Sequence, residues 1–376
     1  MTSKLNGINV SGHRTRLLVV VLAAFFLRFY VCFFSQLPQF STDSHTYLRM
    51  AEQILRGSPI SFFPNGFPLI IVGMKSFVGN DAYLISALMA LNVLMSTCVV
   101  WLAFHIGNSA ADAEVGLAAA LLTTFWPNQV YYSRQILSEV PASFFLMLGL
   151  LLLLRQKALF SGIVLFAAAW VRTSLAPVVI LLLAICLIAP KRRNEALPMM
   201  VGFGIGFAAE FILQTTGIVE ASSNFNLNFL LAISNMSTNG IRSSLVGFSE
   251  HEKAHPIATY LSFAITHPLE FLLQRLSSIY ELWGPWPHAG DPQSPRSMAT
   301  RLIIGLRFPL VLLALVGVWA RRQDASTWIL ASPILTVTAI HAAFYSAEPR
   351  YTHPVEPLAI VLASIGLTAL IRHKAN

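Results

Sequence analysis

The chain has 376 residues, of which 55% are hydrophobic and only 11% are charged, and its formal net charge is +8. Soluble globular proteins carry about 25% charged residues, so this composition excludes a soluble enzyme, a disordered chain and a nucleic-acid-binding domain. We therefore expect no nucleic acid among its partners. Apolar runs extend from one end of the chain to the other, which indicates one all-α, polytopic membrane domain over 1–376.

The apolar runs are long enough to cross a bilayer, which needs about 20 mostly apolar residues. We predict membrane spans over 17–35, 82–105, 114–132, 139–154, 198–217, 301–320, 327–345 and 355–371. The segment 158–189 is too long for one span and too short for two, and Arg172, Thr173 and Pro177 interrupt it. We predict a broken pair of half-spans that meet at Arg172, which gives about ten crossings in all.

Basic residues set the orientation, because Lys and Arg are enriched in cytoplasmic segments. Lys157 precedes the broken pair while Lys191 and Arg192 follow it, so both of its ends face the cytoplasm. The same rule places the N- and C-termini in the cytoplasm. The first outer loop (36–81) and a large outer loop (218–300) then lie outside, where we expect the functional site. A bacterial inner membrane with a periplasmic site fits this topology, and an endoplasmic reticulum membrane would give the same pattern.

The first outer loop begins with a predicted amphipathic helix. From Tyr47 onward, apolar residues recur at helical spacing and charged residues take the other face, which is typical of a helix on the membrane surface. Residues 41–44 offer N-cap side chains, and Gly57 ends the helix. A second short helix is predicted over 68–78. Asp43 is the first outward carboxylate after the first span, and the local pattern alone equally suits a plain N-cap aspartate.

A series of short motifs follows the first span. They are Asp-Ser-x-x-Tyr-Leu from Asp43, Pro-x-Gly-Phe-Pro from Pro64, Phe-Trp-Pro from Phe125, Leu137-Ser138-Glu139, Val171-Arg172-Thr173, His267-Pro268-Leu269-Glu270-Phe271 and Glu348-Pro349-Arg350-Tyr351. In this order, over 17–371, they resemble the GT-C superfamily, of the protein-mannosyltransferase and aminoarabinose-transferase type. The resemblance implies that a sugar passes, with inversion, from a polyprenyl-phosphate donor to a hydroxyl of a glycan, lipid or protein. Membrane lipid is the other expected partner.

The resemblance also implies roles for individual residues. The acceptor oxygen needs a general base, and Asp43 takes this place. Glu139 takes the place of a second carboxylate, which holds the acceptor or, together with Asp43, a divalent cation such as Mg²⁺ or Mn²⁺. The structural alternative for Glu139 is a charge at a helix N-terminus. Tyr47 and His45 lie beside Asp43 in the sequence and are expected to contact substrate.

The phosphate leaving group needs positive charge rather than a general acid. The candidates for this role are Arg172, Arg350, Arg134 and His353. Arginine suits bidentate contacts to phosphate. The structural alternatives are an ion pair of Arg172 with Glu210 or Glu348, and a headgroup anchor for Arg350. Arg28, near the outer end of the first span, is expected to snorkel to the membrane surface.

Two other functions stay open. Polytopic helices with broken spans also suit a transporter or flippase for lipid or solute, although no internal repeat is visible here. His251-Glu252-Lys253-Ala254-His255 matches the H-E-x-x-H pattern of zinc metalloproteases. Pro256 disfavours a helix at His255, which weakens the protease interpretation.

Overall fold

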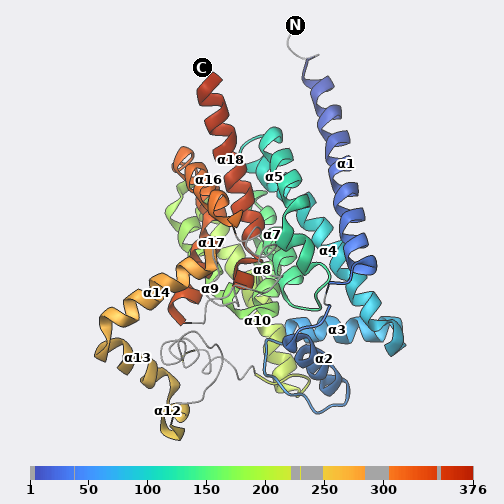
Figure 1. The fold of residues 1–376 in the computed structure, drawn as a ribbon, viewed down its shortest axis with the longest axis vertical. Coiled ribbons are helices and arrows are strands. Elements are labelled where there is room, and N and C mark those ends of the chain that lie inside the picture. Colours follow the sequence, from blue (N-terminus) through green and yellow to red (C-terminus); the bar gives the residue numbers. More distant parts are fainter. Residues whose placement is uncertain are drawn as a thin grey trace.

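Figure 1 shows the computed structural model, which describes residues 5–37, 39–221, 229, 249–283, 305–344 and 349–375. The helices are α1 (Leu5–Phe34), α2 (Thr42–Leu55), α3 (Gly66–Val78), α4 (Asp81–Ala110), α5 (Ala113–Phe125), α6 (Pro127–Tyr132), α7 (Glu139–Leu154), α8 (Ala158–Val171), α9 (Ala176–Ile188), α10 (Arg193–Thr215), α12 (Glu250–Ala254), α13 (Pro256–Thr266), α14 (Pro268–Trp283), α16 (Arg307–Ala320), α17 (Ala325–Phe344) and α18 (Glu356–Ala375). Short 3₁₀ turns are η1 (Thr173–Leu175), η2 (Pro190–Arg192) and η3 (Pro349–Thr352). These ranges contain no strand, which confirms the all-α class for this part of the chain.

The long helices form a bundle whose two ends differ. The start of α1 and the end of α18 lie at the same end of the molecule (Figure 1). Helices α2 and α3 and the chain from α12 to α14 lie towards the other end. The two termini therefore share one end of the bundle, as the charge pattern predicts. Their assignment to the cytoplasm stays a prediction.

Five helices are long and apolar enough to cross a membrane by length and composition. They are Gly12–Phe34, Asp81–Ala110, Pro190–Thr215, Ala325–Phe344 and Glu356–His373. Shorter apolar helices include α5, α7, α8 and α16. The predicted total of about ten crossings stays a prediction, because many of these helices are shorter than the roughly 20 residues of a full span. The predicted span 114–132 is two helices, since Trp126 is extended and Pro127 begins α6.

The predicted break at Arg172 is present. Helix α8 ends at Val171, and Arg172 has an extended backbone with φ −148° and ψ 104°. One 3₁₀ turn follows, and α9 then begins with Pro177 in its first turn. Proline fits there because the first helical positions need no N–H donor. The break places Arg172 between two apolar half-helices. In one continuous helix the same arginine would lie within the bilayer.

Glycines allow two helix pairs to pack closely. A Cβ atom on Gly162 of α8 would lie 2.1 Å from a backbone oxygen of α10, and one on Gly202 would lie 2.0 Å from a backbone oxygen of α8. In the same way, a Cβ atom on Gly317 of α16 or on Gly366 of α18 would overlap a backbone oxygen of the other helix. Larger residues at these positions would push the helices apart, so the backbone contact fixes both pairs.

Arg28 differs from its prediction. Its side chain is fully buried rather than extended to the membrane surface. It donates hydrogen bonds to Ser96 Oγ at 2.7 Å and to the carbonyl oxygens of Thr123 at 3.0 Å and Thr124 at 3.2 Å. The last carbonyl groups of a helix lack intrahelical partners, so Arg28 caps the C-terminal end of α5 from within the bundle.

Candidate functional site

Asp43 lies in the first turn of α2, but it does not cap the helix. Ser41 is the N-cap, and it exchanges hydrogen bonds with Ser44 in a capping box. The plain N-cap alternative for Asp43 is therefore excluded. Its carboxylate pairs with Arg350 instead, with Arg350 Nη1 2.7 Å from Asp43 Oδ2. The Asp43 and Arg350 side chains are 28% and 25% exposed, so the pair is partly accessible at the protein surface.

Glu139 and Arg172 form a second, more deeply buried ion pair. Glu139 is the first residue of α7, where the helix dipole favours a negative charge. Arg172 Nη1 lies 3.2 Å from Glu139 Oε1, and the two side chains are 12% and 4% exposed, respectively. The partner of Arg172 is thus Glu139 rather than Glu210, while Glu348 lies outside the described residues. Glu139 Oε2 is buried and has no hydrogen-bond partner among the described residues.

The ring of Tyr351 connects these two ion pairs. The guanidinium carbon of Arg172 lies 5.3 Å from the centre of this ring, and that of Arg350 lies 5.2 Å from it. These distances suit cation–π contacts. The imidazole of His341 stacks on Tyr351 with a centroid distance of 4.4 Å. The structure therefore brings Asp43, Glu139, Arg172 and Arg350 together around one ring. From the roles assigned to these four residues we expect them to line one outward-facing cavity that opens sideways to lipid, and that cavity stays a prediction.

Tyr47 and His45 have different surroundings. Tyr47 is buried, and its hydroxyl lies 3.2 Å from Ser138 Oγ, next to Glu139 in the chain. This hydrogen bond ties the helix that carries Asp43 to the start of α7. His45 is exposed and stacks on Phe40 at a centroid distance of 5.3 Å. Residues two apart in a helix point in different directions, so His45 leaves the face that Asp43 and Tyr47 share.

Arg134 does not join this group. Its Nη1 donates to the carbonyl oxygen of Val31 at 3.1 Å and to that of Cys32. These carbonyl groups belong to the last turn of α1, so Arg134 caps that helix. The contacts support a structural role in place of the predicted phosphate contact.

His353 lies inside the protein and is not suited to hold a phosphate by charge. It is fully buried, and its ring contacts that of Tyr132 edge to face, with 4.7 Å between centroids. Burial, followed by the positive charges of Arg172 and Arg307, lowers the pKa of His353 to about 3. The imidazole is therefore neutral at physiological pH and contributes no positive charge.

A third ion pair, which the sequence analysis missed, lies beneath the turn η3. Arg307 Nη2 lies 2.6 Å from Glu356 Oε1, and both side chains are almost completely buried. The same carboxylate accepts hydrogen bonds from Trp126 Nε1 at 3.2 Å, Asn128 Nδ2 at 2.8 Å and Thr352 Oγ1 at 3.3 Å. It therefore fixes η3, which carries Arg350 and Tyr351, against α6. An arginine inside the predicted span 301–320 was the available signal, since charges at membrane depth mark functional sites.

The carboxylates of the site do not form a ready metal site. Among the described ranges, no group of three or more His, Cys, Asp or Glu residues is placed to hold a metal ion. Asp43 and Glu139 each face an arginine instead. Mg²⁺ and Mn²⁺ prefer several oxygen ligands, which these two ion pairs do not supply as they stand. A divalent cation held by Asp43 and Glu139 therefore stays a prediction.

The H-E-x-x-H segment is not a continuous helix. Helix α12 has only five residues, and the chain bends at His255 before Pro256 begins α13. Glu252 closes a capping box, with Oε2 2.7 Å from the backbone nitrogen and from the hydroxyl of Ser249. A zincin site needs both histidines on one helix with the glutamate free as a base. The geometry of this segment does not support the protease interpretation.

The arrangement of helices resembles that of an archaeal oligosaccharyltransferase. The complex of AglB from Archaeoglobus fulgidus with an inhibitory peptide and a dolichol-phosphate has a TM-score of 0.61 and 13% identity, over 96% of this chain and 50% of that one. The same enzyme tethered to an acceptor peptide gives a TM-score of 0.63 at 13% identity, over 96% of this chain and 50% of that one. The apo form of the oligosaccharyltransferase has a TM-score of 0.59 and 15% identity, over 96% of this chain and 51% of that one.

The likeness shows a shared fold, and this chain spans about half the length of each of these structures. No model of a known protein family and no curated protein sequence matches the chain.

Proposed function

We propose that the chain is a membrane glycosyltransferase of the GT-C type that uses a polyprenyl-phosphate sugar as donor. The observation that carries this proposal is the meeting of two carboxylate–arginine pairs, from four separate segments, around Tyr351. The fold likeness supports it, because one similar structure is an oligosaccharyltransferase with a bound dolichol-phosphate. A transporter would need residues that couple transport near the bilayer midplane, whereas Asp43 lies on a helix of the first outer loop.

The proposed reaction is a single displacement at the anomeric carbon. Asp43 accepts the proton of the acceptor hydroxyl while its oxygen forms a bond to that carbon. The bond from the anomeric carbon to the phosphate oxygen breaks, and the lipid phosphate leaves with the electron pair. Arg172 and Arg350 stabilise the negative charge that develops on the phosphate. Attack from the face opposite to the leaving group inverts the anomeric configuration.

Because Asp43 is paired with Arg350, binding of the donor acts directly on the proposed general base. In the free protein Arg350 neutralises Asp43 across 2.7 Å. A donor phosphate beside Arg350 competes for the same guanidinium, since arginine binds phosphate in a bidentate manner. When Arg350 turns to the phosphate, the carboxylate of Asp43 is released to accept a proton. We propose that the donor thereby activates the base, which limits reaction to the loaded enzyme.

Glu139 has a different proposed role. Its Oε1 is held by Arg172, and its buried Oε2 has no partner among the described residues. Buried polar atoms almost always have hydrogen-bond partners. We propose that Oε2 accepts a hydrogen bond from a hydroxyl of the sugar or the acceptor. Glu139 would then orient the substrate, while Asp43 moves the proton.

The acceptor is proposed only as a class. A similar structure was solved with a tethered acceptor peptide, and this chain covers about half of that protein's length. A hydroxyl of a glycan, a lipid or a protein fits the reaction equally well. We propose that the reaction occurs on the outer face of a bacterial inner membrane, with both chain termini in the cytoplasm.

The direct test is transfer by the purified protein in detergent. Radiolabelled polyprenyl-phosphate sugars are offered one at a time, with a membrane extract as the source of acceptors. We expect label to move from one donor to an acceptor, with inversion of the anomeric configuration. If no donor is used, and the protein reconstituted into vesicles moves labelled lipid or solute across the bilayer, then the transporter alternative replaces this proposal.

A further inference from the structure

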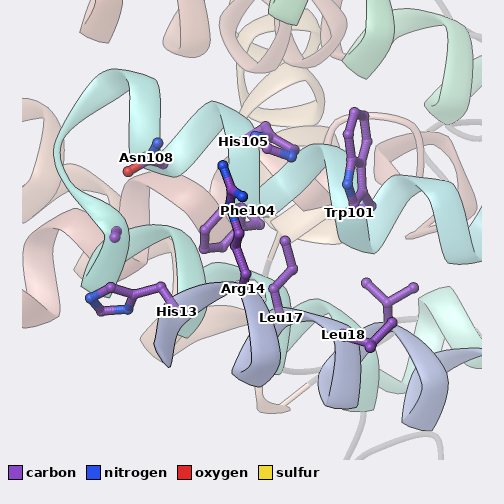
Figure 2. Close-up of a pocket in the computed structure, with 10 residues that line it drawn as sticks. His13, Arg14, Leu17, Leu18, Trp101, Phe104, His105 and Asn108 are labelled. Atoms are coloured by element: carbon purple, nitrogen blue, oxygen red, sulfur yellow. The ribbon is translucent and has the colours of Figure 1, made fainter. Parts of the chain in front are cut away.

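A second potential binding site lies far from the Asp43–Arg350 and Glu139–Arg172 ion pairs, at the end of the bundle that holds both termini. A cavity of about 520 Å³, partly open to the surface, is lined by α1, the last turns of α4 and the start of α5 (Figure 2). Its volume is within the range of about 300–1,000 Å³ that is typical of ligand pockets. The proposed reaction makes no use of this cavity.

The polar side of the cavity is positively charged. Figure 2 shows the Arg14 side chain rising from α1 towards His105 and Asn108 of α4. Arg14 makes no ion pair or hydrogen bond with any residue that the structure describes. Arg155 brings a second guanidinium to this wall, with Nη2 3.2 Å from His105 Nδ1. Nδ1 of His13, which also lines the cavity, is buried and lacks a hydrogen-bond partner in the described ranges.

Acidic residues close to the cavity are already paired. Asp112 and Glu114 flank Ala113, which lines the cavity. Arg372 of α18 lies 2.9 Å from Asp112 and 3.0 Å from Glu114. One oxygen of Asp112 also caps α5 by accepting from the backbone nitrogens of Glu114 and Val115. These carboxylates are therefore committed to other partners, and the charge of Arg14 is left for a ligand.

The rest of the cavity is apolar and continuous with the outer surface of the bundle. Leu17, Val21 and Phe104 form its walls together with Leu18 and Trp101. Leu18 is 58% exposed and Trp101 is 38% exposed, although both belong to helices apolar enough to span a membrane. In a bilayer, such exposed apolar side chains face lipid. A ligand of this cavity would thus meet cations at one end and hydrocarbon at the other.

We propose that this cavity binds an anionic membrane phospholipid. Arg14 and His13 hold the headgroup phosphate, and an acyl chain lies along Leu18 and Trp101. Arginine near the end of a membrane helix is well placed for such a phosphate. The site is separate from the proposed active site, and the inference stands whether or not the chain transfers a sugar.

The test measures lipid retained by the purified full-length protein with native mass spectrometry. Phosphatidylglycerol and phosphatidylcholine are added in equal amounts to wild type, Arg14→Gln and Arg16→Gln. Arg16 is a matched control, because it is an exposed arginine on the same helix that does not line the cavity. We expect wild type and Arg16→Gln to retain phosphatidylglycerol preferentially, and Arg14→Gln to retain about ten-fold less, as for loss of a charge-assisted hydrogen bond.

Two further measurements distinguish a phospholipid headgroup from a soluble phosphate as the ligand. Leu18→Trp fills the apolar wall, and we expect it to lose bound lipid while Arg14 stays in place. Inorganic phosphate alone should not raise the melting temperature of wild type at millimolar concentration. Equal retention of phosphatidylglycerol by wild type and Arg14→Gln, or equal retention of both lipids by wild type, would overturn the proposal. A phosphate effect that needs Arg14 but is unchanged in Leu18→Trp would replace the lipid with a soluble anion.

Discussion

Arg350 Nη1 lies 2.7 Å from Asp43 Oδ2, although the two residues are 307 positions apart in the chain. The pair joins the first surface helix to the turn that enters the last helix of the bundle. It is considerably more exposed than the Glu139–Arg172 pair behind it. The accessible pair is therefore the one that we expect a substrate to meet first, and the buried pair lies where we expect its phosphate and sugar to be held.

Replacing Arg350 should weaken the use of the donor. Arg350→Lys keeps the charge but loses the bidentate contact to phosphate. We expect kcat/KM for the donor to fall by about ten- to hundred-fold, which corresponds to loss of one charge-assisted contact in the transition state. The measurement is steady-state transfer at varied donor concentration. Arg56→Lys serves as the control, since Arg56 is an exposed residue paired with Glu52 on the same outer loop, and an equal fall in both variants would contradict the assignment.

Replacing Glu356 should destabilise the protein. Glu356→Gln keeps the size of the side chain but leaves Arg307 buried without a counter-charge. Removing one partner of a buried ion pair costs about 3–5 kcal/mol. The comparison is Asp324→Asn, which breaks the exposed pair with Arg321 and should cost less than about 1 kcal/mol. Thermal unfolding in detergent tests this, and similar melting temperatures for the two variants would show that the buried pair is not structural.

The stability of the protein should depend on pH through His353. Burial and nearby arginines lower its pKa to about 3, whereas an unfolded histidine has a pKa of about 6.5. Between these values the unfolded chain binds the proton more strongly, so stability is present above about pH 6.5 and falls as the pH drops. The expected contribution is about 1.4 kcal/mol per pH unit in this window.

Removal of His353 tests the pH dependence. In His353→Gln we expect the melting temperature to fall less steeply between pH 6.5 and about pH 4.5 than in wild type. His251→Gln is the control, because His251 is exposed on α12 and its removal should leave the slope unchanged. A slope in His353→Gln identical to that of wild type would show that another group is responsible.

Removal of divalent cations by a chelator tests which groups bind the donor phosphate. Because Asp43 and Glu139 each face an arginine, the proposal assigns phosphate binding to the arginines. Transfer should then persist, within about two-fold, after dialysis against EDTA. Loss of transfer that is restored by Mg²⁺ or Mn²⁺ would instead mean that the two carboxylates separate from their arginines to hold a metal ion.

The parts of the structure that depend on local sequence were predictable. The surface helix α2 follows the apolar spacing from Tyr47, and it ends before Gly57, whose φ of +70° suits glycine. The break at Arg172 follows from the length of the apolar run and from Pro177. The resemblance assigned Asp43 and Arg350 to one reaction, but neither it nor any local pattern indicated their direct ion pair.

The parts that depend on which helices face each other were not predictable. Arg28 points into the bundle because α5 ends beside it, and no spacing in the first span indicates this. The partnership of Arg307 with Glu356 likewise requires that α16 and α18 begin side by side. Tyr351 gains its position between two guanidinium groups only when η3 reaches the break at Arg172.

The most direct test of the central claim is sugar transfer by wild type, Asp43→Asn and Asp81→Asn, purified in parallel. Asp81 is an exposed aspartate that pairs with Lys75 at the end of the same outer loop, so it controls for loss of a surface carboxylate. We expect Asp81→Asn to transfer as wild type does, and Asp43→Asn to lose transfer by at least about hundred-fold while its melting temperature is maintained. Transfer by Asp43→Asn at the wild-type rate would contradict the account and would make Glu139 the next candidate for the base.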